Sequence, residues 1–200
     1  MVGGKRLAAA ILAATVAAGC GGSDGDRPEP TRDGSPPERG LVSGPLCEVL
    51  PSGDDPGAPE SLTGEPANVV LTWIPVATTF EAAVRAVGMD DELDDVTVLV
   101  PTDDAFTAAI ERQRLDDLLL TEHRELRTIL EAHVIEGARS LAELRDGDSV
   151  TTLDGTPLTL DPAGEMVRFG GRAETICADY EASNARLHVI DGVLGPTPRP

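Results

Sequence analysis

Hydrophobic residues between positions 66 and 132 recur mostly at the three- and four-residue spacing of helices. In the clearest case, Pro75 opens a segment whose apolar side chains fall on one face before Gly88. This pattern predicts an amphipathic helix that a proline begins and a glycine ends. A short apolar segment also follows Pro66. The same helical spacing recurs over residues 103–110, 115–120 and 122–132.

The start of the helix at 103–110 has two candidate caps. The oxygen-bearing side chains of Thr102 and Asp103 both stand where they can accept a hydrogen bond from the first helical turn. Pro101, just before them, ends a run over 96–100 that is rich in β-branched residues. That run predicts a buried strand.

The pattern changes to that of strands after residue 132. Short apolar or alternating runs are separated by turn residues such as Asp154-Gly155. These runs cover residues 133–135, 150–153, 158–160, 166–169, 175–178 and 187–190. Helices first and strands last, with short connections, predict an α+β fold in which helices pack on a largely antiparallel sheet.

The N-terminus has the order of an export signal. Lys5 and Arg6 precede an apolar run over 7–18, which is too short to span a bilayer. The run ends in Val-Ala-Ala-Gly-Cys at Cys20, which resembles the bacterial lipobox, where the cysteine receives a diacylglyceryl group. Residues 1–19 are therefore predicted to be a lipoprotein-type signal peptide and Cys20 the lipid anchor. Cleavage by ordinary signal peptidase, which would give a secreted protein, stays open as the alternative.

The segment that follows Cys20 is predicted to be a tether. Residues 20–46 are rich in Gly, Pro and charged side chains and show no apolar period. This composition is typical of a flexible spacer, which an anchored domain needs. We expect one folded domain over 47–200.

Export also bears on the two remaining cysteines. Cys47 and Cys177 are an even number in an oxidising compartment, where thiols pair. A disulfide between them is predicted, with two separately buried thiols as the alternative.

Composition narrows the function classes. The 200 residues are 40% hydrophobic, which is enough for a folded core. Asp and Glu number 35 against 16 Lys and Arg, and only 2% of residues are aromatic. A net charge of -19 repels phosphate backbones and five aromatic rings cannot build a base-stacking surface, so nucleic acid is excluded as a partner. Lys5 is the only lysine, so no lysine chemistry is expected once the leader is removed.

Three ordered blocks, at residues 97–106, 129–155 and 178–196, resemble the fasciclin domain. The resemblance covers about 66–196 and implies a single fasciclin-like domain with helices on a sheet wedge. Cysteines just before the domain and in a late strand are most similar to those of the secreted and lipid-anchored fasciclin proteins of mycobacteria. The family motif falls on residues for which we expect structural roles: Pro101, Thr102, Asp103, Ala105, Phe106, His133, Gly137, Asp179, Asn184, His188 and Asp191.

Two departures from the family pattern change the expectations. Ala132 replaces the aromatic residue that usually precedes the histidine, and that aromatic–His pair belongs to an integrin-contact motif proposed for animal members. Integrin-type adhesion is therefore disfavoured. Asn184-Ala185 replaces Asn-Gly, so either the turn has a different type or Asn184 alone takes a positive φ.

No enzyme or metal signature is found. His133 and His188 are the best candidates for catalysis or metal binding, but neither has partners at metal-ligand spacing. His123 is expected on a helix surface, and the acidic run 90–95 lacks the Gly and terminal Glu of a calcium loop. No catalytic residue, metal or other cofactor is predicted.

The sequence favours a membrane-anchored, extracytoplasmic binding module for cell adhesion or cell-envelope interaction. Its partner would be a cell-envelope or extracellular protein. The alternative is a lipoprotein that binds a lipid or another small hydrophobic ligand, for which an apolar cleft between helices and sheet would be needed.

Overall fold

A computed structural model describes residues 42–195. The predicted signal peptide, Cys20 and most of the predicted tether lie outside these residues. Within 42–195, no helix combines the length and the apolar character needed to cross a membrane.

Helices make up most of the first half of the described chain. Two short 3-10 helices, η1 (Cys47–Val49) and η2 (Asp90–Glu92), accompany the α-helices. The α-helices are α1 (Pro59–Leu62), α2 (Ala67–Thr72), α3 (Thr78–Val87), α4 (Asp103–Ala109), α5 (Arg112–Leu120), α6 (His123–Glu131) and α7 (Leu141–Asp146).

Seven strands form one sheet in the order β2-β1-β7-β6-β5-β4-β3. Their bounds are β1 (Val96–Pro101), β2 (Val134–Glu136), β3 (Ser149–Thr151), β4 (Pro157–Ala163), β5 (Met166–Phe169), β6 (Ala173–Glu181) and β7 (Ala185–Ile190). The β1–β7 pair is parallel, and the other five pairs are antiparallel. A bridge between Ile135 and Thr152 brings the two edges of the sheet together. The predicted α+β fold with a largely antiparallel sheet is confirmed.

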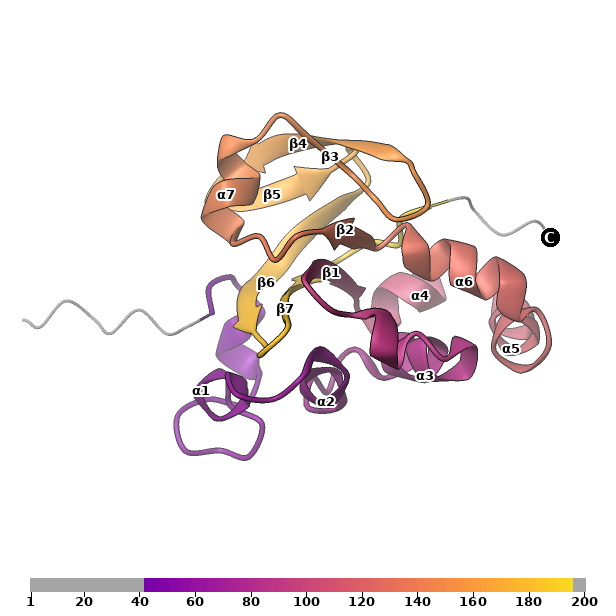
Figure 1. Cartoon of the computed structure of the whole chain (residues 1–200), viewed down its shortest axis with the longest axis horizontal. Helices are drawn as coiled ribbons and strands as arrows, with labels where there is room; N and C mark the ends of the chain where they lie inside the picture. The colour runs from indigo at the N-terminus through magenta and orange to yellow at the C-terminus, as the bar shows by residue number, and fades with distance from the viewer. Residues whose placement is uncertain (1–41, 196–200) are drawn as a thin grey trace, which may run out of the picture. The chain divides into compact units, whose positions relative to one another are not determined.

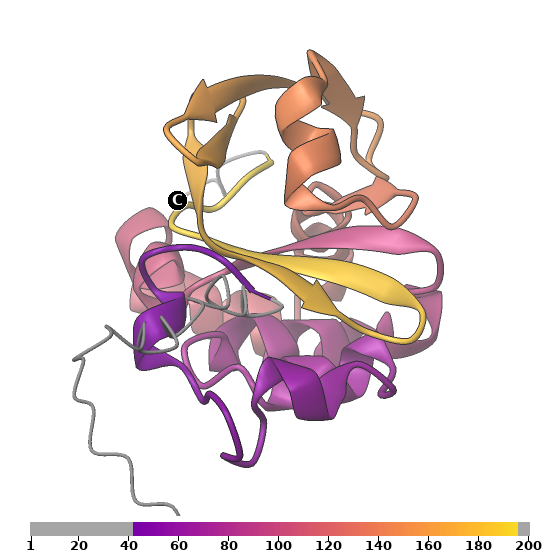
Figure 2. The same ribbon diagram turned by 90° about the vertical axis from the view of Figure 1, so that its left-hand side faces the viewer.

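The central strands separate two layers (Figures 1 and 2). Helices α1 to α6 lie on one side of β1 and β7, and α7 with β3, β4 and β5 lies on the other. Each side has its own apolar core. The order of the chain therefore places the two halves of the sequence on opposite faces of the central strands.

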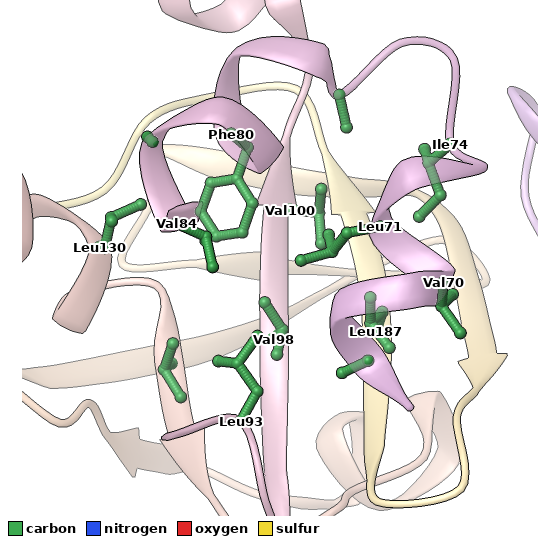
Figure 3. Close-up of a cluster of buried hydrophobic side chains, with 14 of the residues drawn as sticks. Val70, Leu71, Ile74, Phe80, Val84, Leu93, Val98, Val100, Leu130 and Leu187 are labelled. Carbon is green, nitrogen blue, oxygen red and sulfur yellow. The ribbon is translucent and has the colours of Figure 1, made fainter. Parts of the chain in front are cut away.

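Strand β1 is apolar except for Thr97, and the layers on its two faces explain this pattern. Val98 and Val100 belong to the helix-side core, where they lie close to Phe80 and Val84 of α3 (Figure 3). Leu99, between them, belongs to the other core. All six residues of β1 are buried, because both faces of this strand are covered.

Most predicted helices and strands are present, but the start of one helix differs and one helix was not predicted. Helix α3 begins at Thr78 rather than at Pro75, because Asp103 from another part of the chain binds its first turn. Helix α7 lies in a region that the pattern assigned mainly to strands. It is stabilised by a capping box, in which Ser140 accepts from the Glu143 N–H and Glu143 accepts from the Ser140 N–H.

Candidate binding groove

A disulfide holds the N-terminal segment of the described chain against the sheet. Cys47 of η1 and Cys177 of β6 are joined, with their Cα atoms 5.1 Å apart and 130 positions apart in sequence. Backbone hydrogen bonds continue the attachment on both sides of the bond: Leu46 N–H donates to Ile176 O at 2.9 Å, and Ala178 N–H donates to Ser43 O at 2.7 Å. The chain entering the domain is thus bound to β6 by covalent and polar contacts.

Next to this attachment lies a groove of about 570 Å³ between η1, β6 and the start of α4. We call it the α4 groove. Its apolar lining is supplied by Leu46, Pro75, Val76, Ala105, Ala108 and Ile176. Its polar lining is supplied by Thr102, Asp103, Asp104 and Asp191. The groove is open to solvent, since Pro75 and Ala108 are exposed and Leu46 and Ile176 are half-buried.

Thr102 and Asp103 organise one wall of the α4 groove. Thr102 is the N-cap of α4, and its hydroxyl accepts a hydrogen bond from the Ala105 N–H at 3.1 Å. Asp103 caps the neighbouring helix instead. Its carboxylate accepts from the Thr79 N–H at 2.7 Å and from the Thr78 hydroxyl at 2.9 Å. Of the two caps that the sequence left open for α4, the structure uses Thr102.

The electrostatics of Asp103 follow from these contacts. Partial burial acts to raise the pKa of Asp103, but hydrogen bonds from Thr79 and Thr78 outweigh it and hold the pKa below its ordinary value. Asp191 is also engaged, because its carboxylate accepts from the Glu174 N–H at 2.7 Å. Asp104 is exposed, and no hydrogen bond from residues 42–195 reaches its carboxylate. The groove therefore holds two fixed carboxylates and one with free oxygens.

The other residues of the first block serve the fold. Pro101 is the last residue of β1, and it lies opposite Ile190 in β7. Phe106 is 1% exposed and belongs to the helix-side core. Ala105 is buried beneath the groove.

His133 is fully buried, and its hydrogen bonds link two segments of the chain. Its Nε2 accepts a hydrogen bond from the Leu194 N–H at 2.8 Å, so the proton is on Nδ1, which donates to Ile129 O at 2.7 Å. Burial lowers the pKa of His133 to about 4, although the bond to Ile129 acts in the opposite direction. Both ring nitrogens are engaged, so neither is available to a metal or a substrate.

His188 is also buried and also links two segments of the chain by hydrogen bonds. Its Nδ1 accepts from the Asp179 N–H at 3.2 Å, and its Nε2 donates to Arg139 O at 2.9 Å. Burial lowers the pKa of His188 as well. Asp179 takes a positive φ of 69°, and its carboxylate accepts from the Leu141 N–H at 2.9 Å, at the start of α7. The pair attaches the α7 layer to the central strands.

Asn184 and Gly137 fix two further connections. The Asn184 amide accepts from the Ala67 N–H at 2.9 Å and donates to Leu93 O at 2.7 Å, which holds the start of α2. Asn184 does not take a positive φ, which excludes the second of the two alternatives for this turn: Asp95 and Asp179 are the non-glycine residues with positive φ in the described part of the chain. Gly137 has a φ of 82°, and its carbonyl accepts from the Thr97 hydroxyl.

The two remaining candidates for metal binding are His123 and the acidic run 90–95. His123 is exposed on α6. In the acidic run, Glu92 forms an ion pair with Arg127 at 2.8 Å. Residues 42–195 contain no group of three or more His, Cys, Asp and Glu side chains arranged to hold a metal ion.

Ala132 is covered by the C-terminal segment. It is 2% exposed, and a Cβ placed on Gly195 would lie 2.8 Å from the Ala132 methyl. An aromatic ring at this position would displace the segment that His133 holds through Leu194. In place of the aromatic–His pair of the animal motif, this chain therefore has Ala132 packed against the C-terminal segment.

The sequence did not reveal the α4 groove itself. Of the eleven predicted motif residues, four line it: Thr102, Asp103, Ala105 and Asp191. The other six lining residues were not among the predicted site residues: Leu46, Pro75, Val76, Asp104, Ala108 and Ile176. Leu46 and Ile176 come immediately before the two cysteines. A disulfide brings the residues beside its cysteines together. The predicted Cys47–Cys177 pair could therefore have indicated that Leu46 and Ile176 lie close to each other.

Comparisons with known proteins find a matching family model and several similar proteins. The family model of the Fasciclin domain matches residues 75–196. Protein sll1483 of Synechocystis sp. is 37% identical over 123 residues, which are 60% of this chain and 67% of that protein. Immunogenic protein MPB70 of Mycobacterium bovis is 31% identical over 173 residues, 81% of this chain and 86% of that protein. A solved structure of a FAS1 domain pair from the insect cell adhesion molecule Fasciclin I matches with a TM-score of 0.46 and 25% sequence identity. The match covers 60% of this chain and 45% of the chain in that structure.

Proposed function

Because this chain belongs to the fasciclin domain family, we propose that it is an extracytoplasmic binding module, anchored by a lipid on Cys20, that contacts a protein of the cell envelope. Fasciclin domains are generally cell-adhesion or binding modules. The anchor would place the domain at the outer face of the cytoplasmic membrane, and secretion without an anchor is the alternative. The domain would occupy 47–200 and the tether 20–46.

The observation that carries the proposal is the convergence of motif residues on one open groove. Thr102 and Asp103 come from the first family block and Asp191 from the third, and all three line the α4 groove. The disulfide beside it fixes the wall formed by Leu46 and Ile176. A preformed concave surface at the point where the tether enters the domain is suited to binding a partner.

The composition of the predicted tether supports the anchor. Leu46 lies 26 positions after Cys20. A Gly-rich chain of that length would have an end-to-end distance of roughly 25–30 Å, enough to hold the α4 groove clear of lipid headgroups.

Mass spectrometry of the detergent-extracted protein tests the anchor. We expect a mature chain that begins at Cys20 and carries added acyl mass, and we expect Cys20→Ala to abolish that mass and the membrane association. An unmodified chain that begins elsewhere and is found in the medium would contradict the anchor.

A pull-down from cell envelopes tests the binding role. The bait is the complete chain, compared with an Ala108→Trp variant that fills the α4 groove. The matched control is Ala109→Trp, which changes the next exposed residue of α4 outside the groove lining. We expect a protein captured by the wild type and by Ala109→Trp but not by Ala108→Trp. Equal capture by all three would remove the groove from the proposal.

A second candidate function is the binding of a small hydrophobic ligand. It is favoured by the volume of the α4 groove, about 570 Å³, which falls in the range of small-molecule sites. Six of its ten lining residues are apolar. Extraction of the purified protein with organic solvent would test this function, with a stoichiometric apolar molecule as the expected result and an empty extract as the contrary one.

A further inference from the structure

We infer that the α4 groove binds an amphipathic organic cation, a small molecule with an apolar body and one ammonium or guanidinium group. The inference rests on the second candidate function and specifies its ligand. It follows from the separation of apolar and charged residues in the lining and from the sign of the charge.

The apolar part of the groove would hold the body of the ligand. Leu46 and Ile176 form one wall and are held together by the disulfide between the residues that follow them. Ala105 and Ala108 of α4 also line the groove, and their small side chains occupy little of its volume. Apolar surface of this kind gains free energy when a ligand covers it.

The charged part of the groove selects the sign of the head group. Three carboxylates, those of Asp103, Asp104 and Asp191, line it, and no basic residue does. Two of these carboxylates are fixed by backbone hydrogen bonds from Thr79 and Glu174, so they cannot turn away from the groove. Asp104 has its oxygens free to accept from an ammonium or guanidinium group.

The same arrangement excludes the opposite class of amphiphile. A fatty acid or an anionic lipid would bring its negative head group into a site with three negative charges, and that repulsion opposes the gain from apolar burial. The chain as a whole adds to this preference, since its net charge is -19.

Calorimetric titration of the complete chain in a mild detergent tests the inference with three probes of equal chain length. These are octylguanidinium, octanoate and octanol, and guanidinium without an apolar chain serves as a fourth. We expect octylguanidinium to bind about tenfold more tightly than octanoate at low salt, with a smaller difference at high salt, because charge pairs at a solvent-exposed groove are screened. Guanidinium alone is expected not to bind measurably.

Three variants test where the probes bind and whether the groove prefers a positive charge. Asp104→Asn is expected to weaken octylguanidinium binding by about three- to fivefold, the size of a solvent-exposed charge contact, and to leave octanol unaffected. Asp161→Asn removes the same charge at an exposed position of β4, outside the groove, and is expected to change neither. Ala108→Trp is expected to abolish binding of both probes.

The outcomes separate this inference from the function on which it rests. If octanol binds and Ala108→Trp blocks it, but octanoate binds as well as octylguanidinium, the groove takes apolar ligands and the cation preference is wrong. If no probe binds, both the inference and the second candidate function are overturned. The capture of an envelope protein is tested by the pull-down and is independent of both results.

Discussion

His133 is a motif histidine with a structural role. Its imidazole connects the end of α6 to the C-terminal segment through hydrogen bonds to Ile129 and Leu194, and the bond from the Leu194 N–H requires the neutral ring. A proton added to Nε2 would remove the acceptor for the Leu194 N–H and place a charge in the core.

The stability of the domain should therefore decrease in weak acid. The unfolded chain binds a proton on this ring at the ordinary pKa of 6.5, whereas the folded chain resists protonation down to a pKa of about 4. Between these values the unfolded state holds more protons, so the free energy of unfolding falls as pH is lowered, by about 3 kcal/mol for His133. The lowered pKa of His188 acts in the same direction.

Urea unfolding between pH 7 and pH 4 measures this dependence. His133→Gln is expected to be less stable at pH 7 and to show a shallower slope, while His123→Gln, at an exposed site, should keep the wild-type slope. A wild-type stability that does not change across this range would contradict the assignment of a buried neutral ring.

Neighbouring aspartates of α4 are expected to differ in their effect on stability. Asp103 accepts hydrogen bonds at the first turn of α3, so Asp103→Ala should cost about 1–2 kcal/mol, as the loss of a helix cap does. Asp104 has no such contact with the described chain, and Asp104→Ala should leave the free energy of unfolding unchanged within error. Thermal denaturation of both variants checks this, and equal losses would mean that Asp103 does not cap α3.

At the scale of elements, Phe106 connects α4 to the helix-side core. The ring is 1% exposed, and Phe106→Ala should lower the free energy of unfolding by about 3–5 kcal/mol through lost burial and a residual cavity. Leu120→Ala on α5 is the matched control, because that side chain is 74% exposed. A Phe106→Ala variant that melts with the wild type would show that the first block is placed wrongly.

The elements that the sequence predicted well are those with a strong local signal. The run of β1 is apolar at every position except Thr97 because both of its faces are covered, and Gly88 ends α3 with a φ of 66°. Helix α7 has six residues, too few for a visible helical period, although its capping box of Ser140 and Glu143 was present in the sequence. The α4 groove and the start of α3 depend on contacts between distant segments, which no local pattern encodes.

At the scale of the molecule, the disulfide is expected to stabilise the packing of the segment around Cys47 against β6. It closes a loop of 130 residues, so the chain-entropy model predicts a loss of about 4–5 kcal/mol on reduction. We expect the double substitution of Cys47 and Cys177 by Ser to lower the melting temperature.

Within the folded domain, limited proteolysis should cut the segment 47–57 first when the protein is reduced. Beyond that segment the chain is held again by Ala58 and Leu62, which are buried. Two thiols that react with an alkylating agent in the native, non-reduced protein would contradict the disulfide, and cleavage that begins in the sheet would contradict the role assigned to it.

Photo-crosslinking in intact cells tests the central proposal, that the anchored domain binds a partner through the α4 groove. A photoreactive residue would be placed at Ala108, within the groove, and in a second strain at Asp161, an exposed position outside it. We predict a discrete crosslinked product in the envelope fraction from position 108 that is absent from position 161. The absence of any product from position 108, or the same product from both positions, would contradict the proposal.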